Sequence, residues 1–122
     1  MKRSRNWLWP LLLLLAVAVA QAAKPPTAEL TEAAQRIEAA ALEQADKYAP
    51  VEWQFAIDKL AEAETLSADK KYKEAGPLAG EAAVDAELAA VRARAARARD
   101  EVARKVQSNR NLRQELLGAP AQ

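Results

Sequence analysis

The chain is 122 residues long, enough for one small domain, and its 18 basic and 17 acidic side chains give a net charge of +1. It contains no cysteine and no histidine, which excludes disulfides, thiolate chemistry and most transition-metal sites. With 3 glycines and a large share of alanine, the composition is typical of a helical or coiled-coil protein.

Residues 1–23 have the features of a secretory signal peptide. Three cations among the first five residues precede an apolar run over residues 7–20, and small residues at its end allow cleavage near Ala20 or Ala22. The alternative is an uncleaved membrane anchor, but the run of about 14 residues is shorter than the roughly 20 that a span needs. We therefore expect an exported, periplasmic protein. It should not be a lipoprotein, because no cysteine is present to carry the lipid.

A proline-rich spacer over residues 24–26 precedes two expected helices, over residues 28–48 and 50–68. Ala49 and Pro50 separate them, because proline suits the first position of a helix and disfavours a helical residue before it. The predicted apolar face of the first helix is Leu30, Ala33, Ala34, Ile37, Ala41, Ala45 and Tyr48. That of the second helix is Trp53, Ala56, Ile57, Leu60 and Ala63.

The longest predicted element is a helix over residues 70–117, followed by a tail over residues 118–122. An apolar stripe recurs along it at steps of four and three residues and therefore falls on one side of the helix. This alanine stripe comprises Ala75, Ala79, Ala82, Ala86, Ala89, Ala93 and Ala96. A second apolar series, on roughly the opposite side, comprises Val84, Leu88, Val91, Ala95, Ala98, Val102 and Val106. Two alternatives stay open at Pro77: a kink in a continuous helix, or a helix that starts there.

Together these elements predict an all-α fold over residues 27–117, an antiparallel three-helix bundle with a long C-terminal coiled-coil-like helix. At about 1.5 Å per residue, the first two helices are roughly 30 Å long and the third is nearly 70 Å long. The short helices can therefore cover the long one only to about residue 93, and the remainder overhangs. Either a second copy or another partner covers this overhang, or it is a frayed charged tail.

Charge is unevenly distributed along the chain. Residues 27–90 hold 14 acidic and 6 basic side chains, a balance of −8, whereas residues 92–113 hold 8 basic and 2 acidic ones, a balance of +6. The predicted interface lies on the second apolar series, at Val91, Ala95, Ala98, Val102 and Val106. Selection of a partner by charge is assigned to the neighbouring arginines, Arg92, Arg94, Arg97, Arg99 and Arg104.

Several stretches within residues 27–98 are similar to a known group of proteins. These stretches are Ala49-Pro50 opening a helix, Leu60-Ala61-Glu62-Ala63, Lys71-Tyr72, Ala75, Leu78-Ala79 and Asp85-Ala86-Glu87-Leu88-Ala89. They resemble a family of short exported bacterial helical domains, rich in alanine and of unknown function. Its members are often lipoproteins, and some precede an outer-membrane-protein-A-like domain that binds peptidoglycan. The resemblance implies a helical fold in the cell envelope and brings no catalytic residue with it.

No set of residues predicts catalysis, a metal site or a cofactor. Neither histidine nor cysteine is available as base or nucleophile, and two carboxylates that share a helix face, such as Glu81 and Asp85, are too few for a hard cation. We expect a non-enzymatic envelope protein that acts through coiled-coil packing, by self-association or on another envelope protein. The alternative is a surface binder whose basic C-terminal helix holds anionic lipid or peptidoglycan. Export argues against nucleic acid as a partner.

Overall fold

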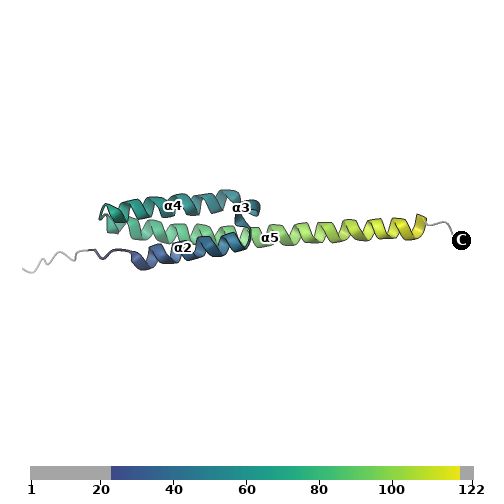
Figure 1. Cartoon of the computed structure of the whole chain (residues 1–122), viewed down its shortest axis with the longest axis horizontal. Coiled ribbons are helices and arrows are strands. Elements are labelled where there is room, and N and C mark those ends of the chain that lie inside the picture. Colours follow the sequence, from purple (N-terminus) through teal and green to yellow (C-terminus); the bar gives the residue numbers. More distant parts are fainter. Residues whose placement is uncertain (1–22, 119–122) are drawn as a thin grey trace, which may run out of the picture.

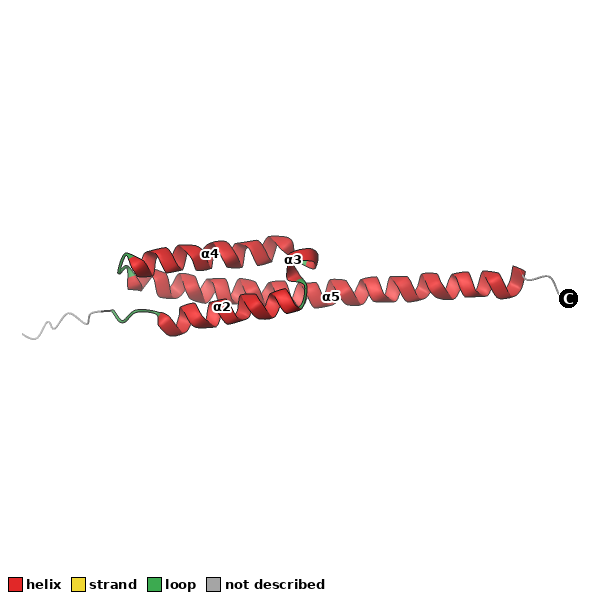
Figure 2. Ribbon diagram, in the orientation of Figure 1, coloured by secondary structure: helices red, strands yellow, loops and turns green. Residues whose placement is uncertain are grey.

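The structure, a computed structural model, describes residues 23–118. Over that range the chain forms α2 (Thr27–Leu42), α3 (Ala45–Tyr48), α4 (Pro50–Ala68) and α5 (Tyr72–Gly118) (Figure 2). Helices α2 and α4 lie along the first half of α5, and the second half of α5 extends beyond them (Figure 1). The expected all-α fold with a long C-terminal helix is confirmed for these residues. The predicted signal peptide, except for residue 23, and the tail after Gly118 lie outside them.

The long helix α5 is continuous through Pro77. The alternative in which a helix starts at Pro77 is therefore wrong, since α5 begins at Tyr72. Proline removes one backbone N–H and crowds the carbonyl four residues earlier. Here that carbonyl belongs to Lys73, in the first turn of α5, so the disturbance stays near the helix end. The 47 residues of α5 correspond to about 70 Å of helix.

The turn between α4 and α5 explains why α5 begins at Tyr72 and not at residue 70 as predicted. Lys70 adopts the left-handed conformation, with a φ of 60°. The N–H of Lys71 donates to the carbonyl of Leu66 (2.8 Å), and that of Lys70 donates to the carbonyl of Ser67 (3.0 Å). This pair of hydrogen bonds is a Schellman motif, which usually carries glycine at the left-handed position. Lysine fills that position here, so no glycine in the sequence signals the turn.

The helix predicted over residues 28–48 is wrong in one respect, because it breaks after Leu42. Gln44 has a φ of 62°, in the left-handed region, and the short helix α3 then redirects the chain toward α4 (Figure 1). A left-handed non-glycine residue costs roughly 1–2 kcal/mol. Contacts on either side of Gln44 compensate, because Ala40 and Ala45 are both fully buried against α5.

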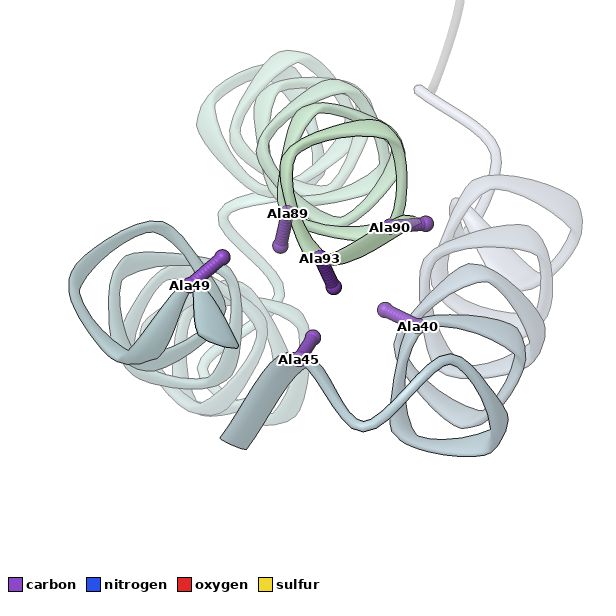
Figure 3. Packing of buried hydrophobic residues seen from close by; sticks show 6 residues of the cluster. All are labelled: Ala40, Ala45, Ala49, Ala89, Ala90 and Ala93. Atoms are coloured by element: carbon purple, nitrogen blue, oxygen red, sulfur yellow. The ribbon is translucent and has the colours of Figure 1, made fainter. Parts of the chain in front are cut away.

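The core consists of alanine. The thirteen residues of the buried core are all alanines, and within residues 23–118 no larger side chain is fully buried. They are Ala33, Ala40, Ala45, Ala49, Ala56, Ala63, Ala75, Ala79, Ala82, Ala86, Ala89, Ala90 and Ala93. In Figure 3 the methyl groups of Ala40 and Ala45 point toward Ala93, where three helices meet. The alanine stripe of α5 is thus the inner face of the bundle, and only Ala96 at its end is half-buried.

Two larger side chains, Tyr48 and Trp53, cover the end of this core while staying partly exposed. On α2 the buried positions are Ala33 and Ala40, whereas Ala34 and Ala41, which were predicted to face inward, are exposed. The helix is therefore rotated slightly from the predicted face. Because only methyl groups separate the backbones, the helices can approach closely, but each buried methyl contributes only about 0.8 kcal/mol.

Candidate interaction surface on α5

The face of α5 opposite the alanine stripe carries a second line of residues, which we call the seam. The seam comprises Val84, Leu88, Val91, Ala95, Ala98, Val102, Lys105, Asn109, Leu112 and Leu116. The steps alternate between four and three residues without interruption, so all ten positions project from one face of the helix. Eight of them are apolar, and the two polar ones are Lys105 and Asn109.

Most of the seam is open to solvent. Val84 is 64% exposed, Val91 53% and Val102 62%, and Leu112 and Leu116 are 53% and 79% exposed. Large apolar side chains thus lie on the outer face of α5 while alanines fill the inside, and an exposed row of large apolar side chains of this kind is typical of an interaction site. We therefore take the seam as the candidate functional site.

The structure places all five predicted interface residues on or beside the seam. Val91, Ala95, Ala98 and Val102 follow its spacing, while Val106 lies one position off it and is 42% exposed. Ala95 is half-buried at the end of the bundle. From Ala98 to Gly118 every residue of α5 is exposed, so the overhang predicted from residue 93 begins near residue 98. At about 1.5 Å per residue this overhang measures roughly 30 Å.

Three of the arginines assigned to partner selection have acidic partners in the same chain. Glu43, at the end of α2, accepts a hydrogen bond from Nη1 of Arg97 (2.8 Å) and lies 3.4 Å from Nε of Arg94. The Glu43 carbonyl also accepts a longer bond from Arg97 (3.5 Å). Glu52, in the first turn of α4, pairs with Arg92. These pairs lie where the short helices end on α5 and hold that corner of the bundle together.

The other two predicted arginines lie on the overhang. No ion pair joins Arg99 or Arg104 to another residue of the described range. Selection of a partner by charge thus stays a prediction for all five arginines. Nearby, Lys105 bonds Glu101 at 2.9 Å, and this hydrogen bond lowers the pKa of Glu101 below its usual value. The acid-first spacing of four residues supports the exposed helix.

Further ion pairs join the three helices away from the corner. Lys59 of α4 bridges Asp85 (2.8 Å) and Glu81 (3.1 Å) of α5. The hydrogen bond to Asp85, followed by that to Glu81, raises the pKa of Lys59 above its usual 10.5. Arg36 of α2 lies 3.7 Å from Glu87 of α5. Glu81 and Asp85, considered as a weak cation pair from sequence, therefore serve as partners of a lysine.

Sequence reasoning missed Glu43 and Glu52, because the arginines were assigned to a neighbouring chain. One available signal was the antiparallel register of α4 and α5. Residues about equally far from the turn at Lys70 face one another, which brings Glu52 to Arg92 just as it brings Lys59 to Asp85. The position of Glu43 could not be found this way, since it depends on the break at Gln44.

Within residues 23–118 no helix is long and apolar enough to cross a membrane. The same residues contain no group of three or more acidic side chains placed to hold a metal ion.

A known protein family matches more than half of the chain. The family described as a domain of unknown function, DUF4398, matches residues 28–105. The chain belongs to this family. The expected resemblance to an uncharacterised family of helical domains is thereby confirmed, and the matched range includes α2, α3, α4 and the first 34 of the 47 residues of α5. The seam positions Asn109, Leu112 and Leu116 lie beyond the part that DUF4398 matches. No curated protein and no solved structure matches the chain.

Proposed function

We propose that the chain is a non-enzymatic helical protein of the bacterial cell envelope, exported to the periplasm, that acts by packing the seam of α5 against another helix. The observation that carries this proposal is the distribution of apolar side chains. Alanines occupy the core, whereas Val84, Val91 and Val102 are more than half exposed on one face of α5. Heptad-spaced valine and leucine on a long helix are the side chains that coiled-coil packing buries.

The energetics support the same proposal. Fully burying a valine or leucine contributes about 1.5–3 kcal/mol, against about 0.8 kcal/mol for an alanine methyl. The side chains with the most to gain from burial are therefore those that the single chain leaves in water. The overhang has no cover in the single chain, and helices in proteins owe most of their stability to tertiary packing of an apolar face. A partner helix would stabilise the overhang and bury the seam together.

Sedimentation of the purified chain tests the proposal, with Val102→Asp as the seam variant. The matched control is Val51→Asp on α4, because Val51 and Val102 are similarly exposed at 58% and 62%. We expect wild-type mass to rise with concentration, Val102→Asp to remove that rise, and Val51→Asp to behave as wild type. Helix content measured by circular dichroism confirms that both variants fold.

A partner of another kind is sought in cells, with a photo-crosslinking residue at Ala98 and a control at Val51. Adducts at Ala98 and not at Val51 support packing through the seam. A chain that stays monomeric at every concentration and forms no adduct at Ala98 contradicts the proposal.

Binding to anionic lipid or peptidoglycan through the basic helix is the weaker alternative. Arg92, Arg94 and Arg97 are engaged by carboxylates of the same chain. The overhang, residues 98–118, holds 5 basic and 3 acidic side chains, a balance of +2. Cosedimentation with anionic vesicles and with purified peptidoglycan tests this alternative. Binding that disappears at high salt would favour it over packing, because salt screens exposed charges.

Export is tested separately by the mass of the chain made from its full sequence in a bacterial host. We expect the product to begin near residue 21 or 23 and to be released with the periplasmic fraction. A product that keeps Met1 and stays with the cytoplasm would contradict the location and leave the packing proposal standing.

A further inference from the structure

The seam positions alternate between two sets, which correspond to the a and d positions of a coiled-coil heptad. The spacing within the seam shows which set is a and which is d. Leu88, Ala95, Val102, Asn109 and Leu116 are spaced by seven residues, and each of the first four is followed three residues later by a seam position of the other kind. In a heptad the first of two apolar positions three residues apart is the a position and the second is d. Asn109 is therefore the one uncharged polar residue at an a position.

An asparagine at an a position distinguishes the ways in which a second helix can pack. A buried amide that finds no hydrogen-bond partner is unfavourable. In a parallel, in-register pair of identical helices, Asn109 meets the partner's Asn109, and the two amides can bond to each other. In an antiparallel pair an a residue meets a d residue, and the d residues here are Val84, Val91, Ala98, Lys105 and Leu112. Four of these five side chains are apolar and cannot form a hydrogen bond with the Asn109 amide.

One antiparallel register does place a polar residue, Lys105, opposite Asn109. That register overlaps only residues 96–118 of the two helices and leaves Val84, Leu88 and Val91 uncovered. It also sets like charges against each other at the flanks, Glu101 near the partner's Glu115 and Arg99 near the partner's Arg113. The register therefore satisfies Asn109 while leaving the most apolar part of the seam in water.

The flanking charges are compatible with the parallel arrangement. In a parallel coiled coil, a residue one place before a lies beside the residue five places later on the partner. This rule brings Glu87 beside the partner's Arg92. Glu87 already lies 3.7 Å from Arg36, and Arg92 pairs with Glu52 of its own chain, so the contact would complete an alternating row of four charges across the interface.

In this arrangement the basic stretch over residues 92–113 lies beside the same stretch of the partner, although Arg92, Arg94 and Arg97 are paired with carboxylates of their own chain. Two individual like-charge contacts also oppose the arrangement. Arg94 would lie near the partner's Arg99, but Glu43 already neutralises Arg94 from 3.4 Å. Lys105 would lie level with the partner's Lys105, yet its side chain is 74% exposed and bonded to Glu101 at 2.9 Å. A long, flexible lysine can leave its stem on the seam and keep its charge in water.

We propose that two copies of this chain pair through the seam as a parallel, in-register coiled coil, with the two Asn109 side chains fixing the register. This inference rests on the proposed function and names its partner. Every large apolar seam residue then packs against its own equivalent over the whole range from residue 84 to residue 116. Both bundles lie at one end of the rod and both overhangs at the other. Pro26 lies beside Gly76 near the start of α5, so residues 23–26 of both copies lie at the bundle end.

Single-cysteine cross-linking tests the orientation, because the natural chain has no cysteine. The purified full chain carrying Asn109→Cys or Leu116→Cys is oxidised and its disulfide-linked dimers are measured. We expect nearly complete dimer for both variants and only background dimer for the control Gln107→Cys, which lies on the opposite face of α5. Leu116→Cys keeps the test valid if replacing Asn109 itself weakens association.

The antiparallel alternative has its own signal. In the register that covers the whole seam antiparallel, residue 109 meets residue 91 of the partner. A disulfide that forms only when Val91→Cys and Asn109→Cys chains are mixed would overturn the parallel orientation and leave the packing function intact. Photo-crosslinks from Ala98 to a different protein, on a chain that is itself monomeric, would overturn self-pairing. The proposed packing function would still stand in that case. Absence of dimers and of seam adducts together would overturn both.

Discussion

Replacing Ala86 by leucine tests whether the bundle depends on close approach of its helices. Ala86 is fully buried at 0% exposure on the inner face of α5. Leucine adds three carbons, and if space were available their burial would stabilise the fold by about 2 kcal/mol, at about 0.8 kcal/mol for each carbon. If the backbones are held apart by methyl groups alone, the extra volume must displace a helix, and overpacking costs typically 1–3 kcal/mol. The two views therefore predict opposite changes in the free energy of unfolding: an increase if space is available, and a decrease if the helices are already in close contact.

We expect Ala86→Leu to lower the free energy of unfolding by about 1–3 kcal/mol. Ala86→Gly should lower it by about 2 kcal/mol, from the lost methyl and the poorer helix propensity of glycine. The matched control is Ala98→Leu, the same change on an exposed seam position of the same helix, which should not destabilise. Urea unfolding followed by circular dichroism, at one protein concentration, measures all three. An Ala86→Leu variant more stable than wild type would refute the close-packed alanine core.

Gly80→Ala should raise stability by about 1 kcal/mol in the same assay, because glycine is a poor helix former and nothing lies within 4 Å of the added Cβ; an unchanged or lower stability would contradict this. Lys70→Gly should add about 1 kcal/mol, since glycine adopts the left-handed conformation without the steric cost; a loss would mean that the lysine side chain matters more than its backbone. Glu43→Gln should cost about 1 kcal/mol by removing the partner of two arginines, whereas the same change at the exposed Glu38 should cost little. The raised pKa of Lys59 contributes stability that is fully present below pH 10.5 and lost as the pH rises through the higher folded value; a Lys59→Met variant should therefore lose less stability than wild type between neutral and strongly alkaline pH, and equal losses would contradict the bridge.

Because the core is small, the ion pairs at the corner around Glu43 contribute a larger share of the stability than they would beside a larger core. The alanine cluster formed by Ala40, Ala45, Ala49, Ala89, Ala90 and Ala93 contributes only methyl groups. Its neighbours are the ion pairs from Glu43 and Glu52 to the arginines of α5. Because these carboxylates are partly buried, at 30% and 16% side-chain exposure, their pairs are less screened than fully exposed ones. They also fix where the short helices end along α5, and thus where the free seam begins.

The sequence by itself determined the helical fold, the inner face of α5 and its excess length. Positions such as Ala75, Ala82 and Ala89 are set by a repeat of three and four residues, and the geometry of an α-helix alone places them on one face. The overhang follows from helix lengths in the same way, because helices of 16 and 19 residues cannot cover one of 47. Both conclusions use information that is local in the chain.

Only the tertiary structure decided the break at Gln44, the burial of Ala40 in place of Ala41, and the carboxylates that the arginines meet. Gln44 and Lys70 adopt left-handed conformations although neither is a glycine. Buried alanines on both sides compensate the local cost at Gln44, and the two hydrogen bonds of the Schellman motif accompany it at Lys70. Glu43 reaches Arg94 and Arg97 across more than fifty residues of sequence, a distance over which no periodic pattern carries information. Long-range contacts depend on how the helices are placed against one another, and that placement is a property of the assembled bundle.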